Sequence, residues 1–282
     1  MSEKIFRILK QEAGLSSDYN DSLRQNPNNL SNWFPIVKDC GIRVPDTLII
    51  QCPDRIIKAS FMDKFDEDEE MITDWLSGHM SEIREAINDP VIFVKNGTFS
   101  NKFDANASCL SHTYNLHELV DKIININYTA LMFGADGTSE LVFRKLIPYE
   151  EEMIPCIYNG LPFRPEYRVF YDFDTHEVLY SVNYWDWDYC YKAISRNATD
   201  RIVFEAYYDL VERAFKSNKE YIEEQVALSM KDITGLTGKW SIDIMQEKMG
   251  INKEIDKINN FWLIDMAIAE RSAYWNPDKC TK

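Results

Sequence analysis

Two aspartates lie inside apolar, strand-like segments in the last part of the sequence. Asp243 stands within WSIDIM and Asp265 within FWLIDMA. A carboxylate among apolar neighbours is costly to bury unless a cation or hydrogen-bond donors compensate its charge. Carboxylate oxygens are the hard ligands that Mg²⁺ prefers, so two of them on consecutive strands favour a magnesium site beside nucleotide phosphates. A contact to neighbouring backbone, or an ion pair with Lys or Arg, would explain either aspartate equally well.

A cationic segment that suits phosphate lies earlier in the chain. Four apolar residues, 91–94, lead into Lys95, and the turn and loop NGTFSNK extends from Asn96 to Lys102. Gly97 is expected to end the strand because glycine tolerates the positive φ of a tight turn. A lysine at the mouth of a buried strand, followed by a mobile loop rich in donors, suits a phosphate-binding site. Taken by itself, the stretch is explained more simply as a hairpin whose lysine reaches solvent.

Arg168 lies in a third segment, EYRVFYDF, at residues 166–173. Side chains alternate between the two faces of a strand, so Arg168 shares one face with Glu166 and Asp172. The other face carries Tyr167, Val169, Tyr171 and Phe173. The apolar face is expected in the core, which directs Arg168 into solvent or a cleft. Its planar guanidinium matches phosphate oxygens better than an ammonium does. A surface ion pair with Glu166 or Asp172 is the alternative.

Composition limits the classes of protein that the chain can belong to. Its 282 residues are enough for one large or two modest domains, and 45% hydrophobic and 13% aromatic residues indicate a globular chain. The net charge of −15 argues against nonspecific binding to nucleic-acid backbones, although a basic cleft within an acidic surface stays open. No apolar run is long enough for a membrane span. Residues 1–14 lack the core of a signal peptide, and six scattered cysteines suggest reduced thiols rather than zinc ligands, so we expect a cytoplasmic protein.

Hydrophobic periodicity predicts an α+β fold in three parts. Residues 1–58 form a lead-in segment, residues 59–133 a first lobe, and residues 134–282 a second lobe with longer, antiparallel strands. The predicted strands span residues 91–95, 139–147, 166–173, 178–185, 239–245 and 260–267, and the predicted helices include residues 116–126, 199–216 and 219–231.

The order of these segments resembles the ATP-grasp superfamily, in which two α+β lobes with mostly antiparallel sheets clamp ATP between them. PVIFVK resembles the strand that ends in the nucleotide-binding lysine, LVFRKLIP the hinge strand beside adenine, and EYRVF the strand whose arginine meets the phosphates. WSIDIM and FWLIDMA resemble the strands that supply metal-binding acids. The amino-acid sequences of these motifs are most similar to those of the cell-division-cycle protein 123 family. The motifs occur in the same order as in that family, within residues 41–275.

The resemblance implies a site for Mg·ATP, with Arg168 and Lys102 as catalytic groups. Ala267 stands where the family has a metal-binding asparagine, so either Glu270 replaces it or only one metal ion is well held. An ion pair with Glu140 is the alternative role for Arg144. The implied nucleotide-binding residues are Lys95, Lys102, Arg144, Lys145, Leu146, Ile147 and Arg168, and the implied metal ligands are Asp243, Asp265 and Glu270.

Two classes of function follow from this resemblance. An ATP-dependent carboxylate–amine ligase would form an acyl phosphate that an amine then attacks, with an unidentified carboxylate or protein as acceptor. The alternative is an ATP-binding assembly factor that grips a protein partner without small-molecule turnover, as the nearest family implies. A kinase is a third option. Neither class requires a nucleic acid or a membrane as partner.

Overall fold

The computed structural model describes residues 17–60, 66–111, 115–147, 155–248 and 260–280. Residues 1–14, on which the expectation about a signal peptide rests, lie outside this range. The chain forms two compact units, of which unit 1 comprises Met1–Asn32 and Asp46–Leu146, and unit 2 comprises Trp33–Pro45 and Ile147–Lys282. None of the helices in the described part combines the length and apolar character needed to cross a bilayer.

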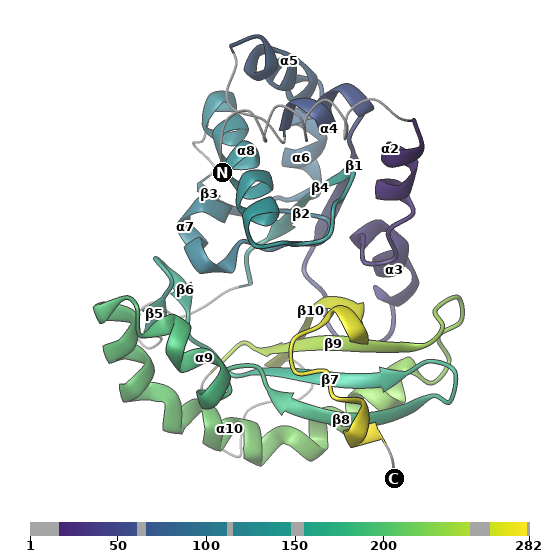
Figure 1. Cartoon of the computed structure of the whole chain (residues 1–282), viewed down its shortest axis with the longest axis vertical. Coiled ribbons are helices and arrows are strands. Elements are labelled where there is room, and N and C mark those ends of the chain that lie inside the picture. Colours follow the sequence, from purple (N-terminus) through teal and green to yellow (C-terminus); the bar gives the residue numbers. More distant parts are fainter. Residues whose placement is uncertain (1–16, 61–65, 112–114, 148–154, 249–259, 281–282) are drawn as a thin grey trace. The chain divides into compact units, whose positions relative to one another are not determined.

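Unit 1 is built on an antiparallel sheet with the strand order β1-β4-β2-β3 (Figure 1). Its strands are β1 (Thr47–Gln51), β2 (Val91–Asn96), β3 (Cys109–Ser111) and β4 (Glu140–Lys145). Its helices are α2 (Ser17–Arg24), α4 (Asp54–Ser60), α5 (Asp66–Ser77), α6 (Met80–Ala86), η1 (Lys102–Asp104), α7 (Ala105–Ser108) and α8 (Leu116–Met132), and α3 (Leu30–Val37) crosses from unit 1 into unit 2.

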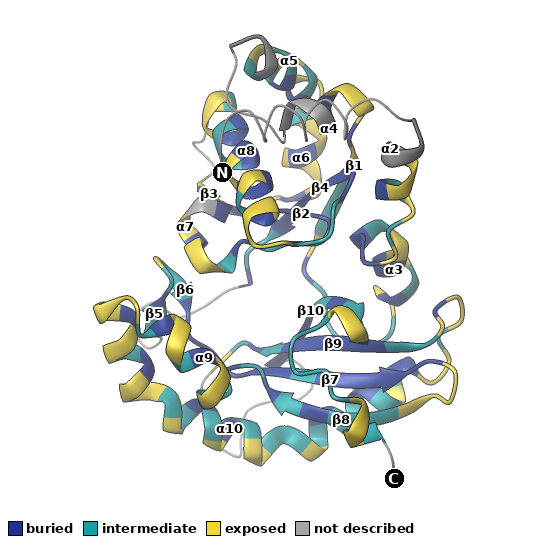
Figure 2. Cartoon of the chain, in the orientation of Figure 1, coloured by how far each residue is buried: buried dark blue, intermediate teal, exposed yellow. Residues whose placement is uncertain are grey.

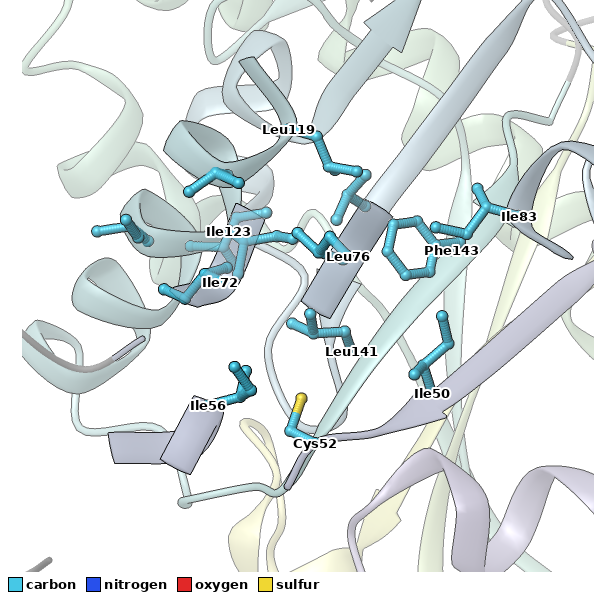
Figure 3. Packing of buried hydrophobic residues seen from close by; sticks show 14 of the residues in the cluster. Ile50, Cys52, Ile56, Ile72, Leu76, Ile83, Leu119, Ile123, Leu141 and Phe143 are labelled. Carbon is cyan, nitrogen blue, oxygen red and sulfur yellow. The ribbon is translucent and has the colours of Figure 1, made fainter. Parts of the chain in front are cut away.

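The core of unit 1 lies between one face of this sheet and the helices. Leu141 and Phe143 of β4 point toward helix residues such as Leu76 and Leu119 (Figure 3). Because side chains alternate along a strand, the intervening residues of β4 and β2 lie on the opposite face. Burial of each large aliphatic side chain contributes about 2 kcal/mol, which fixes the orientation of the sheet and therefore of its second, polar face.

Unit 2 contains an antiparallel sheet with the strand order β10-β9-β7-β8 and a separate hairpin, β5-β6 (Figure 1). Its strands are β5 (Cys156–Ile157), β6 (Leu161–Pro162), β7 (Glu166–Asp172), β8 (Glu177–Asn183), β9 (Lys239–Gln246) and β10 (Phe261–Ile268). Its helices, besides the end of α3, are α9 (Trp187–Ile194), α10 (Ala198–Met230), η3 (Ala269–Arg271) and η4 (Pro277–Cys280).

Helix α10 covers one face of this sheet and runs unbroken for 33 residues, where the sequence predicts two helices. Asn197 caps it by accepting bonds from the N–H groups of its first turn. Asn218, at the expected break, donates from Nδ2 to the Tyr167 hydroxyl at 3.3 Å, so its side chain bonds to the sheet. The Tyr167 hydroxyl donates to the Ala214 carbonyl at 3.2 Å. Exposed residues therefore gather on the outer turns of α10 (Figure 2).

The predicted α+β class with antiparallel sheets is confirmed. The units divide differently from the expected boundaries after residues 58 and 133, because β1, β2 and β4 pair within one sheet. The observed boundary falls between Leu146 and Ile147. The short segment Trp33–Pro45 groups with unit 2, where the Leu263 N–H donates to the Arg43 carbonyl at 2.9 Å.

Candidate functional site

Three of the predicted residues form a row across neighbouring strands of unit 2. Arg168 on β7 lies directly opposite Asp243 on β9, and Asp243 lies opposite Asp265 on β10. Directly opposite residues of antiparallel strands project from the same face, with Cβ atoms about 5 Å apart. The register shifts between Leu263 and Asp265. Without this bulge Asp265 would fall opposite Ile242, on the other face of the sheet, so the bulge completes the row.

The centre of the row is a two-point ion pair. Arg168 donates from Nε to Asp243 Oδ1 at 2.7 Å and from Nη2 to Oδ2 at 2.6 Å. The two side chains are only 12% and 8% exposed, which makes this a buried, charge-assisted pair. An ion pair was one alternative for each of these residues. The partner of Arg168, however, is the aspartate of the adjacent strand rather than Glu166 or Asp172 of its own strand.

The Arg168 guanidinium is held on further sides. Nη1 donates to the Ala273 carbonyl at 3.3 Å, and Cζ lies 4.9 Å from the ring centroid of Tyr184. Burial lowers the pKa of Arg168, but the charge and hydrogen bonds of Asp243, with smaller contributions from Tyr184 and Asp265, raise that pKa above its usual value. Arginine has five N–H donors. Within the described residues, one N–H on each terminal nitrogen of Arg168 has no protein acceptor.

The remaining predicted metal ligands are placed differently. Asp265 is half-buried, and its Oδ1 accepts from the N–H of Met266 at 3.1 Å. Ala267 lies opposite Ser241, and Glu270 is exposed in η3. In the parts of the chain that the structure describes, no three His, Cys, Asp or Glu side chains form a cluster that could hold a metal ion. The strand register thus brings Asp243 and Asp265 together but not Glu270.

The two aspartates have the chemistry to hold one Mg²⁺ ion. Mg²⁺ is commonly bound through one or two carboxylates, with water and substrate phosphates completing its shell. Each oxygen of Asp243 accepts one bond from Arg168 and keeps further acceptor capacity. The donor set on this face therefore matches a single magnesium ion better than a pair.

In unit 1, Lys95 and Arg144 place two positive charges on the polar face of the sheet. Lys95 is 1% exposed and Arg144 is 4% exposed. The register puts Lys95 opposite Val142, so the two cations are diagonal neighbours on adjacent strands, about 7–8 Å apart at Cα. Arg144 donates from Nε to Thr47 Oγ1 at 3.1 Å.

The carboxylate of Glu140, the alternative partner of Arg144, is directed elsewhere. Its Oε1 accepts from the N–H of Ser31 at 3.1 Å, at the start of α3. Its Oε2 accepts from Nε2 of Gln51 at 2.9 Å. These bonds tie β4 to β1 and to the beginning of α3, so Glu140 has a role in holding the sheet edge.

The first half of the predicted phosphate loop is fixed to the adjacent loop. Asn96 Oδ1 accepts from the N–H of Thr98 at 3.2 Å, and Thr98 Oγ1 donates to the Asp136 carbonyl at 2.6 Å. A Cβ atom on Gly97 would lie 2.4 Å from Thr138 Oγ1. The close approach of Thr138 to the backbone of Gly97 therefore requires glycine at this position. The expectation that Gly97 has a positive φ is wrong. Lys102, half-buried, begins η1 after this fixed section.

The predicted adenine-binding segment lies where the chain passes between the units. The Lys145 N–H donates to the Asp46 carbonyl at 2.9 Å, and Lys145 Nζ lies 3.5 Å from Asp89 Oδ2. The Ile147 carbonyl accepts from Arg164 Nη2 at 3.0 Å. Leu146, half-buried, is the last residue of unit 1. Two of the backbone groups expected to meet adenine therefore already have partners within the chain.

Sequence reasoning missed the residues that surround Arg168. Tyr184 begins the aromatic-rich cluster of residues 184–189, YWDWDY, but its contact with a guanidinium has no local signal. Trp185 in the same cluster is 1% exposed, and its ring centroid lies 5.4 Å from that of Phe163. Part of the cluster therefore belongs to the hydrophobic core. Ala273 follows β10, and only the tertiary fold shows that this segment returns to β7.

No protein-family model matches the sequence, and a search of characterised proteins finds no match either. Among solved structures, the chain is similar to Cdc123. For C-terminally truncated Cdc123 from Schizosaccharomyces pombe, the identity is 14%, the TM-score 0.46, and the coverage 87% of this chain and 85% of the other.

Two ATP-grasp enzymes are also similar. One is D-alanine–D-alanine ligase from Bacillus anthracis complexed with ATP, with 12% identity, a TM-score of 0.34, and coverage of 85% of this chain and 52% of that one. The other is the biotin carboxylase domain of 2-oxoglutarate carboxylase from Hydrogenobacter thermophilus in complex with MgADP, with 12% identity, a TM-score of 0.40, and coverage of 94% and 50%. The families that the sequence motifs resemble are thus also found among the similar structures.

Proposed function

We propose that the chain binds Mg·ATP through the row formed by Arg168, Asp243 and Asp265. The observation that supports this proposal is the row itself. One face of the unit 2 sheet carries a buried guanidinium with two available N–H groups, next to two carboxylates. A nucleotide polyphosphate needs both kinds of group, because donors bind its oxygens directly and carboxylates hold the magnesium ion that neutralises its charge.

The roles of the three residues follow from their contacts. Asp243 and Asp265 would hold Mg²⁺, which when bound offsets the charge of the phosphates. Arg168 would donate its two remaining N–H groups to phosphate oxygens. Asp243 keeps the guanidinium in place before the ligand arrives. Binding therefore costs little side-chain conformational entropy at Arg168.

In unit 1, Lys95 and Lys102 are proposed to bind phosphate oxygens. The backbone of residues 145–147 is proposed to meet the adenine edge through groups other than the Lys145 N–H and the Ile147 carbonyl, which are bonded within the chain. Lys95 and Arg144 give the polar face of this sheet a local positive charge in a chain whose net charge is −15. Concentrated positive charge on an acidic protein favours a polyanionic ligand at that point.

The first proposed activity is ATP-dependent ligation of a carboxylate to an amine. A carboxylate oxygen would attack the γ-phosphorus, ADP would leave, and the amine would displace phosphate from the acyl phosphate to form an amide. Charge neutralisation and positioning would account for most of the rate enhancement, and Arg168 and Lys102 are the cations proposed for that role.

A specific observation favours the second candidate, an ATP-binding assembly factor. Ala267 cannot ligate a metal ion, and Glu270 lies exposed in η3 rather than in the row. A protein that retains one magnesium ion can bind ATP tightly while turning it over slowly. Its nucleotide would then shape a surface that binds a protein partner.

Equilibrium dialysis against ATP and Mg²⁺ tests the proposed binding of Mg·ATP. Analysis of the products afterwards distinguishes the ligase from the assembly factor. We expect saturable ATP binding in the wild type and weaker binding in Arg168→Ala. Release of ADP and phosphate that amino acids or small peptides stimulate would support the ligase. Retention of intact ATP under the same conditions would support the assembly factor. Absence of ATP retention in the wild type would contradict the proposed function.

A further inference from the structure

The chain returns to the polar face of the unit 2 sheet after β10, and we call residues 272–276 the C-terminal strap (Figure 1, yellow). Ser272 Oγ lies 2.6 Å from Ser241 Oγ on β9. The ring of Trp275 packs against Phe170 of β7, with centroids 5.4 Å apart. The N–H of Asn276 donates to the Tyr180 hydroxyl of β8 at 2.7 Å. Ser272 Oγ also donates to the Ile268 carbonyl of β10 at 3.1 Å, so the strap is tied to all four strands.

Two contacts connect the strap to Arg168. The Ala273 carbonyl accepts from Nη1 at 3.3 Å. The Tyr274 hydroxyl donates to the carbonyl of Tyr184 at 2.6 Å, and the Tyr184 ring lies against the guanidinium. Tyr274 itself has a φ of 68°. A non-glycine residue keeps this backbone conformation only where surrounding contacts hold it, which is a common feature of functional sites.

These contacts decide where the remaining donors of Arg168 point. Asp243 holds Nε and Nη2, and Ala273 holds Nη1, so the plane of the guanidinium is fixed on both edges. The Tyr184 ring limits movement of the guanidinium out of that plane. We propose that the C-terminal strap positions Arg168 toward its phosphate ligand, with Tyr274 as the positioning residue. This inference rests on the proposed Mg·ATP function.

Tyr274→Phe removes the hydroxyl that donates to the Tyr184 carbonyl and that also lies 3.4 Å from Cys190 Sγ. Its effect can be measured by calorimetric titration with Mg·ATP. Loss of one hydrogen bond that orients a ligand-binding group should weaken ATP binding by about threefold to tenfold. Tyr191→Phe is the matched control. The Tyr191 hydroxyl also donates to an acceptor in unit 2, Glu205 at 2.7 Å, but at the surface. ATP affinity in this control should match the wild type.

The same substitution in an Arg168→Ala background separates positioning from general destabilisation. If Tyr274 acts through Arg168, adding Tyr274→Phe to Arg168→Ala should change ATP affinity by less than about twofold. An equal loss in both backgrounds would overturn the positioning role, as would an unchanged affinity in the single variant. If Tyr274→Phe lowers the melting temperature too far for titration, Trp275→Leu loosens the strap from β7 and should weaken ATP binding in the same way. A wild-type protein that does not bind Mg·ATP would instead contradict the proposed function itself.

Discussion

Both units carry a four-stranded antiparallel sheet with one polar face, but the two faces arrange their charges in opposite ways. In unit 2, opposite charges are adjacent, and Arg168 and Asp243 are bonded at two points. In unit 1, like charges are neighbours, because Lys95 and Arg144 share a face while the carboxylate of Glu140 is directed to Ser31 and Gln51. We therefore expect substitutions in the unit 2 row to affect both stability and ligand binding, and substitutions of the unit 1 cations to affect mainly binding.

The largest effect should come from breaking the buried pair of unit 2. Asp243→Ala leaves the guanidinium of Arg168 buried without its main partner, which should lower the free energy of unfolding by about 3 kcal/mol. Urea unfolding in the absence of nucleotide measures this change. The double variant Arg168→Met/Asp243→Leu replaces both charges by apolar groups and should recover much of the loss. A loss in unfolding free energy below about 1 kcal/mol for Asp243→Ala would be typical of a surface ion pair. It would contradict the expectation that substitutions in the unit 2 row affect stability.

Arg168 substitutions test the binding side of the same row. Arg168→Ala should weaken ATP affinity by about thirtyfold, equivalent to about 2 kcal/mol, because phosphate contacts from a buried guanidinium are lost. Arg168→Lys keeps the positive charge but loses the planar set of N–H donors of the guanidinium. Its affinity for ATP should therefore fall between those of Arg168→Ala and the wild type. Dissociation constants within about twofold of wild type for both variants would exclude Arg168 as a phosphate ligand.

The next prediction concerns unit 1. Lys95→Met should weaken ATP binding by about tenfold, because a charge-assisted contact to phosphate is lost. Its melting temperature without nucleotide should fall less than that of Asp243→Ala, since the substitution also relieves repulsion between Lys95 and its diagonal neighbour Arg144. Lys122→Met is the control, because Lys122 donates to the Asn106 carbonyl of the same unit at 2.6 Å. A large loss of stability with unchanged ATP binding would reverse the expected contrast.

The smallest effect is expected for Asp265→Asn. The amide oxygen can still accept from the Met266 N–H, so stability without nucleotide should change little. Loss of a charged metal ligand should weaken Mg²⁺-dependent ATP binding by about fivefold and reduce the melting shift that Mg·ATP produces. Lower stability combined with an undiminished melting shift would show that Asp265 is a structural partner and not a metal ligand.

The sequence predicted the class of fold and the faces of single strands better than it predicted contacts. Alternation along β7 correctly separated Arg168 from the aromatic face that α10 covers. The partner of Arg168 could not be predicted, because it depends on the register between β7 and β9, which are far apart in the chain. Asp265 joins the row only through a bulge, and one residue more or less would move it to the other face.

Backbone geometry at Gly97 gives a second example. The sequence indicates a turn at this point, and Asn96 does form one with Thr98. The reason that glycine is required is a close approach to Thr138, which lies about forty residues away in the chain and has no local signal. The C-terminal strap was missed for the same reason, since its partners lie on strands far upstream.

A calorimetric titration of the wild-type chain with ATP, in Mg²⁺ and again in excess chelator, tests the central claim most directly. Because Asp243 and Asp265 lie next to one another on the face that carries Arg168, we predict saturable binding in Mg²⁺ at millimolar ATP or below. Binding should be clearly weaker once the metal is removed, since the carboxylates then repel the phosphates. The absence of binding heat with millimolar ATP and Mg²⁺, or equal affinity with and without the metal, would contradict the account.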